Sequence, residues 1–293
     1  MYFSRSLTLM NTARLSFYTC LCLLCFITVS CRSTKPGQGL SILQQDTDTV
    51  AIRQRIATIK GISNDVFEPH SFQGAAGIPL QYRLLRPSPT DQSRQYPLII
   101  VFHGSGASGA DNEKQLGLLA KLWATPPIRE KYPAYIVVPQ FPARSSNYTM
   151  DSNRHVLASV PQPALQSALQ LVDSLRKALN ADNSRIYVVG FSMGASTAIN
   201  AMTYRPGLFA AGVSISGIPQ FEKVNELAGI PLWLIHGNSD TENPIDSDKL
   251  FFKEVNSKGQ TRFWIYENTN HNDIFSNTLL GEDIPAWLFN KHK

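Results

Sequence analysis

Short, continuous apolar runs alternate along most of the chain with segments whose composition and apolar spacing suit helices. The apolar runs lie at 96–102, 134–139, 186–189, 211–216, 231–235 and 263–266. Such runs are typical of strands that are covered on both faces of a sheet. The expected helices lie at 112–123, 163–179, 195–201, 221–227, 247–256 and 283–291. This alternation predicts one α/β domain with a mainly parallel sheet and helices on both faces.

The segment ahead of this alternation has a different pattern. Residues 67–72 and 78–85 are strand-like and are separated by a glycine-rich turn, which predicts an antiparallel hairpin that opens the sheet. Residues 41–61 are polar with a thin apolar stripe, so they fit either a leading helix or an ordered linker.

The first thirty residues have the charge layout of a secretory signal. Arg5 and Arg14 precede an apolar run at 15–30 that is shorter than a membrane-spanning helix needs. The alternative is an uncleaved anchor helix. We predict a signal peptide over 1–30 and therefore an exported protein in the periplasm or cell envelope.

All four cysteines lie at or before Cys31, so the predicted domain has no disulfide, cysteine metal site or thiol nucleophile. Thr28-Val29-Ser30-Cys31 resembles the lipobox of bacterial lipoproteins, although Thr28 stands where leucine is usual. Lipidation of Cys31 would anchor the protein to a membrane, and the alternative is ordinary cleavage and release. We predict a tether over 31–46 and the catalytic domain over 47–293.

Composition narrows the function classes. The 293 residues are 43% hydrophobic and 17% charged, with a net charge of +5. The basic residues are scattered without interleaved aromatics, so we expect no nucleic-acid partner. No ligand cluster at metal spacing occurs, and we expect neither metal nor cofactor. The oligomeric state does not follow from the sequence.

The segment 186–201 combines a strand, a tight turn and a helix around one serine. The turn is Gly190-Phe191-Ser192-Met193-Gly194, a G-x-S-x-G motif in the order that this motif requires. The turn points the Ser192 hydroxyl out of the sheet and leaves the Met193 N–H at a helix start, where it can meet an oxyanion. We predict Ser192 as a nucleophile and Met193 as an oxyanion donor; a chance match to the motif is the alternative.

The other strand exits supply candidates for the remaining roles, because ligands of open α/β sheets bind at the carboxyl ends of the strands. The first exit is glycine-rich, 103–109, and its backbone N–H groups at Gly104 or Ser105 suit an oxyanion hole. His103 is expected to support that loop rather than to act as a base. A plain glycine-rich turn is the alternative.

Two further exits carry a carboxylate and a histidine. Asp240 is the first carboxylate past its strand, whereas Asp246 and Asp248 are expected as cap and first-turn charges of the next helix. His271 follows the last strand. Ser192, Asp240 and His271 thus follow the chain order of α/β-hydrolases, in which histidine activates the serine and aspartate orients the histidine.

The chain resembles a known family in several motifs: YPLIIVFHGSGASGADNEKQL, KYPAYIVVPQFP, GFSMG, LIHGNSD, NHNDIF and AWLFNK. Across about Phe67 to Lys291 it is similar to the bacterial esterase and "predicted peptidase" branch of α/β-hydrolases. That branch is related to polyhydroxybutyrate depolymerases, feruloyl and acetyl-xylan esterases and dienelactone hydrolase-like proteins. The resemblance implies the α/β-hydrolase fold, the triad Ser192, Asp240 and His271, and a place for Gln140 near the substrate.

The chain departs from this branch in the loop 143–148, where such proteins often carry tryptophan. Tyr148 is a candidate for the same wall-forming part, and the alternative is that its side chain is simply exposed. We expect a serine carboxylesterase that acts on small or carbohydrate-linked acyl esters. The alternatives are a prolyl-oligopeptidase-like peptidase and a catalytically silent binding lipoprotein.

Overall fold

The computed structural model describes residues 39–44, 46–75, 77–88, 90–91, 93–275 and 279–293. The chain divides into two units, Met1–Lys35 and Pro36–Lys293, and every described residue belongs to the second. The predicted signal peptide and Cys31 therefore lie outside the described residues. Among the described helices, none combines the length and the apolar character needed to cross a bilayer.

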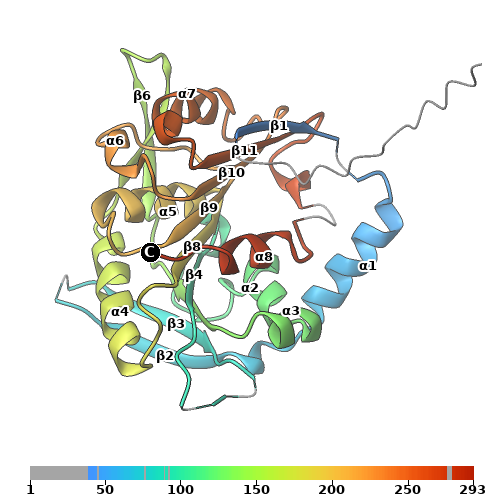
Figure 1. The fold of residues 1–293 in the computed structure, drawn as a ribbon, viewed down its shortest axis with the longest axis vertical. Coiled ribbons are helices and arrows are strands. Elements are labelled where there is room, and N and C mark those ends of the chain that lie inside the picture. The colour runs from blue at the N-terminus through green and yellow to red at the C-terminus, as the bar shows by residue number, and fades with distance from the viewer. Residues whose placement is uncertain (1–38, 45, 76, 89, 92, 276–278) are drawn as a thin grey trace, which may run out of the picture. The chain divides into compact units, whose positions relative to one another are not determined.

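A nine-stranded sheet forms the centre of the described unit, in the order β1-β11-β10-β9-β8-β4-β5-β3-β2 (Figure 1). Its strands are β1 Gly39–Leu43, β2 Glu68–Gln73, β3 Pro79–Leu85, β4 Leu98–Phe102, β5 Tyr135–Gln140, β8 Ile186–Phe191, β9 Ala211–Ile215, β10 Leu232–Gly237 and β11 Thr261–Tyr266. All neighbours pair in parallel except β3, which pairs antiparallel with β2 and β5. The predicted mainly parallel sheet and its opening hairpin are confirmed.

The helices cover both faces of the sheet, also as predicted (Figure 1). They are α1 Thr49–Lys60, α2 Leu118–Lys121, α3 Pro126–Lys131, α4 Ala164–Ala178, α5 Met193–Tyr204, α6 Val224–Leu227, α7 Asp246–Val255 and α8 Asp283–Phe289. Because side chains alternate along a strand, each central strand feeds two cores. In β4, Leu98, Ile100 and Phe102 pack with α4 to α7, and Ile99 and Val101 pack with α1, α2, α3 and α8.

The predicted helix 112–123 is wrong over its first half. Asp111 accepts hydrogen bonds from the Glu113 and Lys114 N–H groups, and Asn112 has a left-handed φ of 55°. This side-chain turn competes with helix formation, and only α2 and the short 3-10 turn Leu122–Ala124 remain. The helix predicted over 221–227 is likewise reduced to α6.

Three strands and the short helix α3 were not predicted. Strands β6 Ser146–Asp151 and β7 Val156–Pro161 form a separate antiparallel hairpin where a loop was expected. Strand β1 pairs in parallel with β11, so Gly39–Leu43 belongs to the sheet and not to the predicted tether. Its residues alternate between half-buried and exposed, as suits an edge strand with one partner, and its five residues lack the continuous apolar run of the central strands.

Candidate active site

Ser192 occupies a strained turn between β8 and α5. Its φ of 58° lies in the left-handed region, which a serine adopts only where the surroundings enforce it. The chain crosses itself here so closely that a Cβ on Gly190 would come within 3.0 Å of the Gly194 backbone, and a Cβ on Gly194 equally close to Phe102. The two glycines permit the turn that holds the half-buried Ser192 hydroxyl at the carboxyl end of the sheet.

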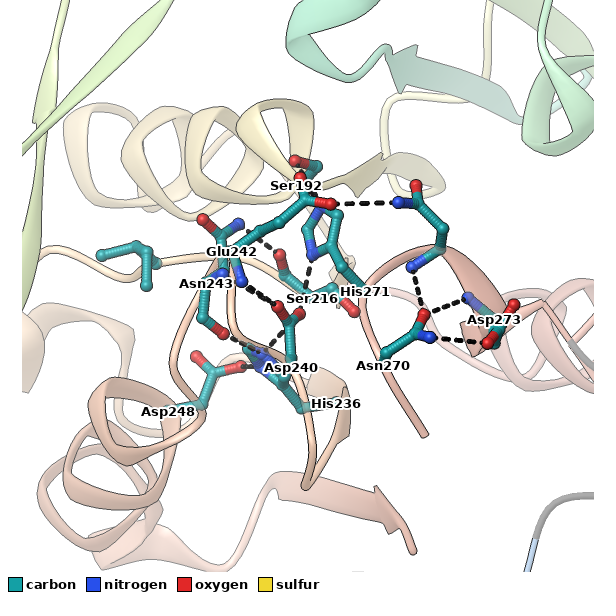
Figure 2. A network of polar contacts seen from close by, with 12 residues as sticks. Ser192, Ser216, His236, Asp240, Glu242, Asn243, Asp248, Asn270, His271 and Asp273 are labelled. Carbon is teal, nitrogen blue, oxygen red and sulfur yellow. Dashed lines mark hydrogen bonds and ion pairs between the residues drawn. The ribbon is translucent and has the colours of Figure 1, made fainter. Parts of the chain in front are cut away.

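The structure brings the predicted serine, histidine and aspartate into one hydrogen-bonded chain (Figure 2). His271 Nε2 lies 2.9 Å from Ser192 Oγ, and His271 Nδ1 lies 2.7 Å from Asp240 Oδ2. Because an ionised carboxylate only accepts, Nδ1 carries the proton and Nε2 presents its lone pair to the serine hydroxyl. The three side chains leave β8, β10 and β11 at the same sheet edge.

Asp240 is buried and fully hydrogen-bonded. Its Oδ1 accepts the N–H groups of Glu242 at 3.0 Å and Asn243 at 2.8 Å, and its Oδ2 faces His271 and His236. Burial alone would raise the pKa of Asp240, but the hydrogen bonds from His236, His271 and Asn243 hold it well below its ordinary value. The carboxylate is therefore charged at neutral pH.

The predicted oxyanion donors lie beside Ser192. Met193 is the first residue of α5, so its N–H has no partner within the helix. Gly104 precedes the 3-10 turn Ser105–Ala107, and a Cβ placed on Gly104 would contact Ser192. His103 supports this loop as predicted: Nδ1 donates to the Gly104 carbonyl at 2.7 Å, and Nε2 accepts the Phe141 N–H at 2.9 Å. Burial lowers the pKa of His103, in keeping with this neutral form.

Gln140 does not have the position of a substrate-binding residue. Its side chain is completely buried, and its amide accepts the Asn112 N–H and donates to Ala107 and Asp111. The amide is thus used within the protein to shape the loop after β4. The predicted place of Gln140 near the substrate is therefore limited to support of this loop.

Tyr148 lies on β6, half-buried, with its hydroxyl 3.2 Å from Ser196 Oγ of α5. Ser196 Oγ also accepts the Ile218 N–H and donates to the Ser192 carbonyl. Tyr148 therefore connects the hairpin to the start of α5, the helix that follows Ser192. Its predicted role in substrate binding stays a prediction.

Three site neighbours were missed in the sequence. The Phe191 ring lies 5.0 Å from the His271 ring, and Phe275 packs on Phe191. Glu242 places Oε2 3.8 Å from His271 Nε2 and accepts a hydrogen bond from Asn272. Its position two residues after Asp240 was the only signal available.

Asp246 and Asp248 both lie in the first turn of α7, as expected, but they differ in burial. Asp246 is an exposed charge in the first turn of α7, as predicted, but Asp248 is fully buried and hydrogen-bonded to the buried His236. Helical spacing explains this, because Asp248 faces the sheet together with Phe251.

A cavity of about 220 Å³ lies beside the predicted oxyanion loop. It is lined mainly by apolar groups, among them Phe102, Gly104, Leu118, Phe191 and Phe275. In the part of the chain that the structure describes, no three His, Cys, Asp or Glu side chains are grouped to hold a metal ion.

Comparison with known proteins identifies esterases among the proteins to which this chain is similar. The family model for phospholipases and carboxylesterases matches residues 89–277. The chain is 28% identical over 153 residues to the esterase candidate NocK of Nocardia uniformis, covering 51% of this chain and 42% of that protein. It is 35% identical over 91 residues to acetylxylan esterase A of Emericella nidulans, covering 31% and 29%.

A solved thermostable esterase shares the fold with a TM-score of 0.70 and 28% sequence identity. The match covers 78% of this chain and 64% of that one. The chain thus spans less than half the length of the curated relatives and under two thirds of this structure.

Proposed function

The chain belongs to the phospholipase/carboxylesterase family of α/β-hydrolases, and on that premise we propose that it is a serine hydrolase of carboxylic esters. The observation that carries the proposal is the hydrogen-bonded chain from Asp240 through His271 to Ser192. A complete constellation of this kind at the carboxyl edge of the sheet argues against a catalytically silent binding protein.

The proposed reaction begins when Ser192 Oγ attacks the ester carbonyl carbon and His271 accepts the hydroxyl proton. Asp240 keeps the imidazole in the required tautomer and stabilises its charged form without taking the proton. The Met193 N–H and an N–H from Gly104 or Ser105 meet the oxyanion. His271 then protonates the departing alcohol, and water repeats the sequence to release the acid from the acyl-enzyme.

We propose small acyl groups as substrates, free or linked to carbohydrate. The 220 Å³ cavity beside Gly104 and Phe191 supports this, because it borders the predicted oxyanion loop, is lined mainly by apolar groups and is small. The acetylxylan esterase relative supports the same class.

The peptidase alternative has one observation in its favour. The exposed Glu242 carboxylate beside His271 could pair with the amino group of a short peptide. Esters remain the better proposal, because an alkoxide leaves more readily than an amine.

The test is a substrate panel of p-nitrophenyl acyl esters, feruloyl and acetyl-xylan substrates and aminoacyl anilides, with Ser192→Ala as the control. We expect hydrolysis of short esters by the unmodified chain alone, with a fluorophosphonate label on Ser192. Hydrolysis of the anilides only would favour the peptidase, and label on another serine would overturn the assignment of the nucleophile.

We also propose that Cys31 carries lipid and holds the enzyme on a membrane of the cell envelope. The signal-like N-terminus and the lipobox-like Thr28-Val29-Ser30-Cys31 support this proposal. Stable anchoring requires more than one acyl chain. Bacteria that express the full chain are fractionated, and we expect the unmodified chain in the membranes and Cys31→Ser in a soluble or unprocessed form. A soluble unmodified chain would instead indicate ordinary cleavage and secretion.

A further inference from the structure

A second buried ion pair lies directly against the candidate catalytic acid (Figure 2). His236, near the end of β10, places Nδ1 2.8 Å from Asp248 Oδ2 of α7 and Nε2 3.2 Å from Asp240 Oδ2. The side chains of all three residues are completely inaccessible to solvent. A buried pair of this kind is costly to maintain unless the charges compensate one another.

The hydrogen-bond partners place one proton on His236 and show where a second would lie. Nε2 lies 2.8 Å from the Asn243 carbonyl oxygen, which can only accept, so Nε2 carries a proton. Nδ1 faces the Asp248 carboxylate. Among the described residues the other Asp248 oxygen has no hydrogen-bond partner, so His236 alone compensates this buried charge. Burial raises the pKa of Asp248, and the hydrogen bond to His236 opposes this effect. With Asp248 ionised, both ring nitrogens donate and the ring is an imidazolium.

The pKa of His236 agrees with this geometry. Burial alone would lower it, but the hydrogen bonds to Asp240 and Asp248 outweigh burial and raise the pKa to about 9. The charged or titratable groups that face His236 are Asp240 from the β10 exit and Asp248 from α7. His271 contacts the ring through Asp240, and Glu242 lies beyond His271.

We propose that His236 and Asp248 form a positioning pair for the reaction at Ser192: His236 keeps Asp240 ionised and directed at His271, and Asp248 keeps His236 charged. The inference rests on the proposed function. Asp240 can stabilise a developing His271 imidazolium only as a carboxylate. Without a cation at His236, two buried carboxylates would face each other, and one would take up a proton.

The decisive comparison uses His236→Gln, Asp248→Asn and the double variant, with exposed Asp246→Asn as the matched control on the same helix turn. We expect His236→Gln to lower kcat about 10- to 100-fold, the range for one hydrogen bond to a charged group, with KM little changed. The acid limb of its kcat/KM profile should move up by about one pH unit, because loss of the His236 cation leaves uncompensated negative charge beside the imidazole of His271.

The double variant separates this role from packing. Removing Asp248 as well takes away the negative charge that His236 compensated and leaves Asp240 as the only carboxylate at this place, so the acid limb should return toward that of the unmodified enzyme. If the pair is purely structural, the double variant should lose more stability than His236→Gln, and its acid limb should not return. An acid limb that stays in place in His236→Gln, or fails to recover in the double variant, overturns the proposal.

A measurement on the unmodified protein covers the case in which the variants do not fold. In ¹⁵N NMR of the histidine-labelled chain at pH 7, His236 should show two protonated ring nitrogens, and a neutral ring overturns the proposal. This result does not depend on activity. If the proposed function is wrong, the result is seen separately, because ester hydrolysis would then survive in Ser192→Ala.

Discussion

Replacing Asp240 by asparagine exchanges one carboxylate oxygen for an NH₂ group, and its effect on each hydrogen bond of Asp240 can be worked out. The amide oxygen of the new side chain would still accept the Glu242 and Asn243 N–H groups. Its NH₂ group would then face the His271 Nδ1–H, where two donors meet. His271 avoids this contact between two donors by adopting the tautomer with its proton on Nε2. In that tautomer Nε2 can no longer accept the proton of Ser192.

The expected loss in kcat is up to about 10⁴-fold, roughly 5.5 kcal/mol of transition-state stabilisation, which is the size that wrong-tautomer variants of other triads set. KM should change little, because Asp240 does not contact the substrate in the proposed reaction. Initial-rate kinetics on p-nitrophenyl acetate measure both constants, and circular dichroism checks that the variant is folded. Activity within tenfold of the unmodified enzyme, or an equal loss in Asp246→Asn, would refute the assignment of the acid.

Three further outcomes follow from the geometry. Ser192→Ala should stay folded and lose about 10⁴- to 10⁶-fold in ester hydrolysis; residual activity above that range in a p-nitrophenyl assay counts against the nucleophile. Gly190→Ala should lower the free energy of unfolding by at least about 1–3 kcal/mol in urea titration, because its Cβ would overlap the Gly194 backbone, whereas Gly117→Ala meets nothing within 4 Å and serves as control. Stability should also fall as pH rises from 6.5 toward about 9, since the raised pKa of His236 stabilises the fold only while the ring is charged; a flat profile in denaturant titrations contradicts this.

The positions of side chains that follow directly after a strand could be predicted from the sequence. Ser192, Asp240 and His271 each follow an apolar run, and the carboxyl ends of parallel strands meet at one sheet edge. The sheet and its opening hairpin followed from the same alternation. Their positions could therefore be predicted without knowledge of packing.

Features that depend on contacts between distant segments could not be predicted in this way. The burial of Asp248 depends on which face of α7 meets the sheet, and a charge in a first helical turn is usually exposed. Glu242 approaches His271 only because two exit loops fold toward each other. Strand β1 lacks a distinctive pattern, and only pairing with β11, far later in the chain, makes it a strand.

The direction of β1 determines how the enzyme would be presented at a surface. Because β1 runs parallel to β11, Gly39 lies at the amino edge of the sheet, opposite the edge where Ser192, Asp240 and His271 meet. The chain therefore enters the described unit on the side away from the candidate catalytic groups. Under the proposed lipidation of Cys31, this entry point favours substrates that approach from the surrounding water.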